Sequence, residues 1–267
     1  SRLDDVMVSY AAPGGGVGPH FDSYDVFLLQ GPGRRSWGVG RPRERKLDPA
    51  APLRILRNFR PEMRWLLEPG DMLYLPPGWA HDGIALEPCF TYSIGLRSPS
   101  RRETAREFLG FLQDRIEFDG HDSDRGAKPV RHPAEIPGKT LRQAAAAVRR
   151  IRWRRRDLET FLGEYLSAPK PHVVFHRPRP ARSLPRFMSL CRRRGLRLDL
   201  RTRMLFRASA FFVNGERVEP ARGLRSWLVR LADERLLPAE RRMPAALLIL
   251  LHGWHVAGWL HVGDRDD

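Results

Sequence analysis

Two histidines and one aspartate, set at a particular spacing, constrain this chain more than any other feature. One residue separates His20 from Asp22, and His81 lies beyond a Pro-Pro-Gly turn at 76–78. Residues two apart on a strand point to the same side of a sheet, so His20 and Asp22 can act together if this segment is extended. His81 precedes a short apolar run, as a side chain from a second strand would. The spacing therefore predicts two strands that carry three ligand-type side chains to one place.

These residue types suit a non-haem iron site. Two imidazoles and one carboxylate occupy one face of an octahedral Fe(II) ion and leave three positions open for a co-substrate and dioxygen. An His-x-Asp pair alone occurs by chance, and the alternative is two surface histidines and a turn-forming Asp22. The distant His81, behind its Pro-Gly turn, makes the metal interpretation more specific. We predict that His20, Asp22 and His81 are the metal ligands and the catalytic centre.

The first hundred residues have the pattern of an all-β domain. Short runs rich in branched and aromatic residues alternate with Gly and Pro, which is typical of a jelly roll or cupin. The predicted strands lie near 6–10, 26–29, 36–39, 72–75 and 91–95.

Three segments of this region resemble the bacterial JmjC-type ribosomal oxygenases, namely 13–27, 30–37 and 67–78. The resemblance implies a mixed α+β protein with a cupin double-stranded β-helix that holds Fe(II) and 2-oxoglutarate, followed by a helical dimerisation region and a winged-helix-like domain. The known bacterial members hydroxylate an arginine of large-subunit ribosomal protein sixteen. Relatives have further residues before this region, so we expect an N-terminally incomplete β-helix whose ability to fold alone is in doubt. The expected domain bounds are 1–98, 99–167 and 168–267.

The same resemblance implies roles for four further residues. Arg35 stands at the family's position for binding the distal carboxylate of 2-oxoglutarate, and a guanidinium fork matches a carboxylate bidentately. Asp5, Tyr24 and Ser93 stand where the family binds the substrate side chain. Each of the four residues also has an alternative structural role. Arg35 could be a surface charge, Asp5 an acid in a turn, Tyr24 a core aromatic, and Ser93 a residue that only fills a strand.

Two positions depart from the family pattern. Relatives carry Ser where this chain has Ala11, and Asn where it has Thr91. Both positions can contact the co-substrate or the iron-bound groups. We therefore expect that the change weakens 2-oxoglutarate binding without affecting the metal ligands.

The rest of the chain reads as helical and then mixed. Helical spacing is expected at 105–114 and across 141–166, with Val148 and Phe161 among the core candidates, and 118–138 reads as a loop. From about residue 170, short β-like runs at 172–175, 204–207 and 210–213 surround a hairpin turn at Asn214-Gly215. Helices near 223–235 and 244–253 flank them, which fits a winged helix.

Charge is concentrated in the second half of the chain. Residues 1–100 contain 12 basic and 11 acidic side chains, whereas residues 101–267 contain 35 and 20. A strongly basic half favours an anionic partner, and ribosomal RNA beside a ribosomal-protein substrate is the natural candidate. The alternative is a solvated basic surface without a partner.

Cellular context and competing functions complete the expectations. Two distant cysteines without a CxxC pair favour a reducing cytoplasm, and no run of roughly 18 apolar residues predicts a membrane helix. Within the oxygenase class, histidine or asparagine hydroxylation and lysine demethylation stay open. A non-oxidative cupin and a non-catalytic ribosome- or RNA-binding protein with a vestigial cupin are the competing classes.

Overall fold

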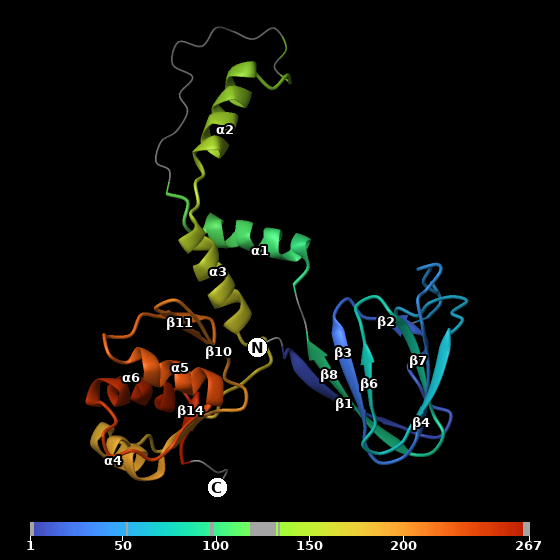
Figure 1. Cartoon of the computed structure of the whole chain (residues 1–267). Helices are drawn as coiled ribbons and strands as arrows, with labels where there is room; N and C mark the ends of the chain where they lie inside the picture. Colours follow the sequence, from blue (N-terminus) through green and yellow to red (C-terminus); the bar gives the residue numbers. More distant parts are fainter. Residues whose placement is uncertain (1–2, 52, 97–98, 118–131, 133, 264–267) are drawn as a thin grey trace. The chain divides into compact units, whose positions relative to one another are not determined.

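The computed structural model describes residues 3–51, 53–96, 99–117, 132 and 134–263, and divides into two compact units, 1–104 and 105–267 (Figure 1). The first unit is built of strands, drawn in blue to green, and the second combines helices and strands, drawn in green to red. Among the described residues, no helix combines the length and apolar character needed to cross a bilayer. Ser98, at the expected boundary, lies outside the described residues, and a further division at residue 167 stays a prediction.

The first unit contains eight antiparallel strands in two four-stranded sheets, with the orders β1-β8-β3-β6 and β2-β7-β4-β5. This is the double-stranded β-helix implied by the resemblance, and its eight strands all lie within the described residues. The strands are β1 (Asp5–Ala11), β2 (His20–Phe21), β3 (Asp25–Gln30), β4 (Arg35–Gly40), β5 (Met63–Leu67), β6 (Met72–Leu75), β7 (Ala80–Ala85) and β8 (Cys89–Leu96).

Alternating burial explains how the two sheets face each other. Along β3, every second residue is buried, and the buried Val26 and Leu28 point inward as the two-residue period of a strand requires. They pack against residues of the opposite sheet, including Trp37, Val39 and Leu67. These apolar side chains line part of the space between the sheets, so polar side chains that point into this space need hydrogen-bond or charge partners.

The second unit holds most of the hydrophobic core. Its helices are α1 (Arg101–Gln113, which begins in the first unit), α2 (Gly138–Arg150), α3 (Arg155–Ser167), α4 (Leu184–Arg194), α5 (Arg225–Glu234) and α6 (Ala245–Val256). Its strands form two three-stranded sheets: β10 (Met204–Arg207), β11 (Ala210–Val213) and β12 (Glu216–Val218), and β13 (Leu236–Leu237), β9 (Leu196–Leu198) and β14 (Leu260–Val262).

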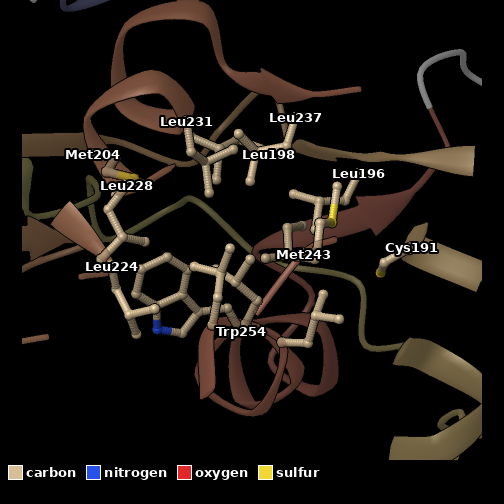
Figure 2. Close-up of a cluster of buried hydrophobic side chains, with 14 of the residues drawn as sticks. Cys191, Leu196, Leu198, Met204, Leu224, Leu228, Leu231, Leu237, Met243 and Trp254 are labelled. Carbon is tan, nitrogen blue, oxygen red and sulfur yellow. The ribbon is translucent and has the colours of Figure 1, made fainter. Parts of the chain in front are cut away.

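Figure 2 shows how this core brings together side chains from several elements. Leu228 and Leu231 of α5, Trp254 of α6, and Leu196 and Leu198 of β9 belong to one buried cluster, in which the Trp254 indole lies beside Leu224. The helices and the small sheets thus share one core, as a winged helix requires. The predicted hairpin is confirmed, since Asn214 and Gly215 both have positive φ and join β11 to β12.

Several expectations for the second unit were wrong. The segment 141–166 forms two helices, α2 and α3, because the chain leaves helical geometry at Ile151–Arg154, and Val148 is exposed instead of buried. Residues 172–175 form no strand, and α4 was missed because its arginines obscure the apolar face. Most of the expected loop at 118–138 lies outside the described residues.

Candidate metal centre and co-substrate pocket

The three predicted ligands come together across one pair of strands. His20 on β2 is the register partner of His81 on β7, and Asp22 follows β2 directly. Their ligand atoms all lie within 4.8 Å of one another, and His81 Nε2 is 3.9 Å from the Asp22 carboxylate. The turn before β7 is tied to this point, because the Gly78 amide donates to the Asp22 carbonyl. Two strands thus present two imidazoles and one carboxylate to the same point.

Backbone carbonyls orient both rings. His20 Nδ1 lies 2.8 Å from the Gly18 carbonyl, and His81 Nδ1 lies 3.4 Å from the Trp79 carbonyl. A carbonyl can only accept, so Nδ1 carries the proton in the neutral form of each ring, and the Nε2 lone pair is then free to bind a metal. Metal-binding histidines are commonly oriented by such a second hydrogen bond. Both rings are therefore held in the tautomer that binds a metal through Nε2.

The protonation states also suit a metal. Burial lowers the pKa of His81 to about 4, with His20 and Arg35 adding to the effect and the Trp79 carbonyl opposing it. His81 is therefore neutral at physiological pH, which is the form that ligates. Burial raises the pKa of Asp22, and the neighbouring His20 partly offsets this. A cation at this point would offset the free-energy cost of burying the charged carboxylate, so the donor set fits a divalent metal.

Arg35 lies buried near the centre, with 5% of its surface exposed. It donates from Nη1 to the Thr91 hydroxyl and from Nη2 to the Gly83 carbonyl, at 3.2 and 3.1 Å. Its Nε has no hydrogen-bond partner among the described residues, and no carboxylate there forms an ion pair with it. Burial lowers the pKa of Arg35, which Cys89 and Asp82 partly oppose. A buried cation without an ion-pair partner among the described residues favours binding of an anionic group from a ligand.

The neighbouring Arg34 points the other way, as the two-residue period of a strand predicts. It is exposed and pairs with Glu87 at 3.1 Å. Of the two adjacent arginines, only Arg35 can therefore serve a ligand between the sheets.

One cavity of about 550 Å³ joins all of the predicted positions. Its walls include the three ligand residues, Arg35, and the expected substrate contacts Asp5, Tyr24 and Ser93. A side chain built on Gly95 would lie 3.3 Å from the Tyr24 ring and 3.8 Å from the Asp5 carboxylate, so these two groups meet at Gly95. Ala11 and Thr91 line the same cavity, and Thr91 is the hydroxyl that Arg35 contacts.

Several wall residues, among them Trp37 and Gly83, were not singled out by sequence reasoning, and Gly83 lies against Gly16, which also lines the cavity. Trp37 shares the inward face of β4 with Arg35, a relation that the two-residue period could have shown. The two glycines let backbone segments approach closely, because a side chain on Gly16 would lie 2.4 Å from the Gly83 carbonyl. No sequence signal marks that contact.

A second cavity of about 400 Å³ adjoins the first. His20, Asp22, Tyr24 and Val17 line both cavities, and the loop between β4 and β5 forms the remaining wall through Leu47, Leu53, Arg54 and Ile55. The two cavities therefore share two of the three predicted ligand residues, His20 and Asp22.

Comparison with known families agrees with this geometry. Residues 1–104 match the JmjC domain family, and residues 150–261 match the ROXA-like winged helix. The chain is 36% identical over 180 residues to the ribosomal protein uL16 3-hydroxylase of Escherichia coli (strain K12), which covers 67% of this chain and 48% of that relative. It is 45% identical over 102 residues to a probable ribosomal oxygenase of Haemophilus influenzae, covering 37% of this chain and 25% of the relative. The chain thus spans about half, or less, of the curated relatives it matches.

Solved structures of a ribosomal oxygenase match almost the full length of this chain. The X-ray structure of Escherichia coli YcfD superposes with a TM-score of 0.78 at 31% identity, covering 97% of this chain and 71% of that one. A structure of YcfD in complex with cobalt and 2-oxoglutarate superposes with a TM-score of 0.76 at 30% identity, covering 97% and 70%. The shared fold, both matched domains and the identity show that this chain belongs to the JmjC ribosomal oxygenase family.

Proposed function

We propose that the protein is an Fe(II)- and 2-oxoglutarate-dependent dioxygenase that hydroxylates an arginine side chain of ribosomal protein uL16, the large-subunit protein sixteen. The observation that carries this proposal is one cavity holding both a two-histidine, one-aspartate cluster and a buried arginine without a carboxylate partner among the described residues. A metal and a dicarboxylic co-substrate meet both requirements at once.

His20, Asp22 and His81 would hold the iron, and Arg35 would bind the distal carboxylate of 2-oxoglutarate. With dioxygen, the bound iron and co-substrate supply an oxidant able to hydroxylate an unactivated C–H bond. The chain's own part is to orient and to exclude water: two backbone carbonyls fix the imidazole tautomers, and Arg35 is already held at two of its nitrogens. The YcfD complex with cobalt and 2-oxoglutarate supports this assignment.

The choice of arginine rests on Asp5. Its carboxylate lines the cavity next to Tyr24, and a guanidinium is the side chain that a carboxylate binds best. Ser93, from β8, adds a hydroxyl to the same wall. We propose these three residues as the substrate contacts. Relatives named as histidyl-hydroxylases also match part of the chain, so histidine stays an alternative target, which substitution of Asp5 distinguishes.

Dimerisation is proposed through the helical region 99–167. Helix α2 has no buried residue, and its apolar side chains Leu141 and Val148 are 67% and 66% exposed. They lie seven residues apart, which places them on one face of the helix. A second copy of the chain covering this face would bury them, and this is the assembly that the family resemblance implies.

The winged-helix domain at 168–267 is proposed to contact ribosomal RNA near the substrate. It contains 20 basic and 9 acidic side chains, and α4 ends in Arg192, Arg193 and Arg194. Basic surfaces draw nucleic acid through counterion release. We place the reaction in the cytoplasm, where the buried thiols Cys89 and Cys191 stay reduced.

Incubation with uL16 tests the proposal. The protein, Fe(II), 2-oxoglutarate and air should add one oxygen atom to an arginine of uL16, as read by peptide mass spectrometry. The His20→Ala variant should add none, whereas His132→Ala, at a histidine outside the cavity, should act like the wild type. Oxygen on a histidine would correct the target. If the folded protein forms neither succinate nor hydroxylated uL16, the proposed dioxygenase activity is refuted.

A further inference from the structure

The inward faces of β4 and β7 fit together in an unusual way. On β4, the buried Arg35, Trp37 and Val39 alternate along the strand. Their register partners on β7 are Ala85, Gly83 and His81, so Trp37 lies opposite a glycine. A side chain added to Gly83 would lie 2.6 Å from the indole and 2.8 Å from Arg35 Nε. The missing side chain therefore makes the room that the indole occupies.

Because of this room, the Trp37 indole contacts both functional neighbours. The Arg35 guanidinium carbon lies 4.7 Å from the indole centroid, and the His81 ring centroid lies 5.8 Å from it. Trp37 is 4% exposed, and its Nε1 has no hydrogen-bond partner among the described residues. The indole thus occupies the space between the buried cation and a metal-ligand histidine without being tied elsewhere by a hydrogen bond.

The guanidinium of Arg35 is held by two kinds of contact. It lies over the Trp37 ring, and its Nη2 donates to the Gly83 carbonyl. A cation over an indole is stabilised most strongly where water is excluded, as it is here. Without the indole, the long Arg35 side chain would regain rotamers that aim its fork away from the cavity.

We propose that Trp37 is a positioning residue that aims the Arg35 guanidinium at the distal carboxylate of 2-oxoglutarate, and that Gly83 is the glycine that makes this possible. The inference rests on the proposed function for the identity of the carboxylate. The stacking of Arg35 on Trp37 is independent of any ligand. Two measurements therefore separate the two claims.

The first measurement is co-substrate affinity, by anaerobic titration of the Fe(II)-loaded full chain. Trp37→Leu should raise the Kd of 2-oxoglutarate on the order of tenfold, which corresponds to the strength of a desolvated cation–π contact. Trp37→Phe, which keeps an aromatic face, should recover part of the loss. Trp65→Leu is the matched control, because Trp65 pairs with Trp37 in the neighbouring strand but is 50% exposed.

Two internal checks distinguish positioning from general damage. The affinity for 2-oxobutyrate, which lacks the distal carboxylate, should not change in Trp37→Leu, because Arg35 has nothing to bind there. In an Arg35→Ala background, Trp37→Leu should add no further loss for 2-oxoglutarate, since its effect passes through the arginine. Equal weakening of both oxo acids, or full additivity, would overturn the proposal.

The second measurement needs no ligand. The Arg35 Nε–H resonance, assigned by its loss in Arg35→Lys, should be shifted upfield by the indole ring in the wild type. It should return toward the usual position in Trp37→Leu and partly in Trp37→Phe. An unshifted wild-type resonance would overturn the proposal outright. A shifted resonance in a protein that does not bind 2-oxoglutarate would support the stacking and refute the proposed co-substrate instead.

Discussion

Replacing Arg35 by methionine tests the co-substrate pocket most sharply. The guanidinium has five N–H donors, and the structure uses one on Nη1 for Thr91 and one on Nη2 for Gly83. One N–H on each Nη and the Nε–H stay available inside the cavity, which suits a carboxylate bound through two parallel hydrogen bonds. Methionine has a similar length and no charge, so it removes these donors while keeping most of the buried volume.

The magnitude follows from those two donors. Hydrogen bonds to a charged group contribute about 1.5 kcal/mol or more each, so their loss should cost about 3 kcal/mol, or roughly a hundredfold in the Kd of 2-oxoglutarate. A co-substrate concentration of about 100 times the wild-type Kd stabilises the wild type by about 2.7 kcal/mol. The same concentration should stabilise Arg35→Met by only about 0.4 kcal/mol.

The assay is thermal unfolding of the Fe(II)-loaded protein, without oxygen, with and without 2-oxoglutarate. The wild type should show a clear rise in Tm on addition of 2-oxoglutarate, and Arg35→Met almost none. Arg34→Met is the control, because Arg34 is the adjacent residue but is exposed and paired with Glu87 on the other face. A full ligand-induced rise in Arg35→Met, or its loss in Arg34→Met, would refute the assignment of Arg35.

Four further changes have defined outcomes. Asp5→Asn should raise the KM for uL16 about tenfold or more while 2-oxoglutarate affinity holds, because one charged hydrogen-bond partner is lost; an unchanged KM would remove Asp5 from the substrate site. In the metal-free protein, the lowered pKa of His81 means that the unfolded chain binds one more proton between about pH 6.5 and 4, so stability is full above pH 6.5 and falls by about 3 kcal/mol toward pH 4. Urea unfolding of wild type and His81→Gln at several pH values should show a shallower acid loss in the variant, and equal slopes would contradict this. Asp199→Asn should destabilise the second unit by about 3 kcal/mol in urea, because the buried Asp199 carboxylate accepts from Arg201 and lies 2.9 Å from His261 Nε2; a change below about 1 kcal/mol would show that the cluster matters little. Val148→Glu on α2 should shift the protein from dimer to monomer in sedimentation, and a wild-type monomer would refute the proposed interface.

The spacing predicted that three ligand-type side chains lie together. His20 and Asp22 share a strand face by the two-residue period, and a turn delivers His81 to the next strand, so the structure brings together what the pattern indicated. The opposite orientations of Arg34 and Arg35 follow from the same rule. The relations of His20 to Asp22 and of Arg34 to Arg35 depend only on neighbours along the chain, whereas the place of His81 also requires the pairing of β2 with β7.

The remaining features depend on contacts between distant segments. The place of Trp37 between Arg35 and His81 depends on its pairing with Gly83, a register that no single segment encodes. Similarly, α3 packs on the β10-β11-β12 sheet through a glycine, since a side chain on Gly163 would lie 2.4 Å from the Phe212 ring of β11. The exposed face of α2 has the same apolar pattern as a core helix, and for that reason Val148 was misassigned to the core.

The most direct test of the whole account is the mass of uL16 after reaction with the protein, Fe(II), 2-oxoglutarate and air. We expect a gain of one oxygen atom on a single arginine, matched by one succinate for each product and absent in His20→Ala. Folded, iron-loaded protein that produces succinate but never oxidises uL16 would contradict the proposed substrate. The absence of both succinate and oxidised uL16 would contradict the central claim that this cavity is an oxygenase site.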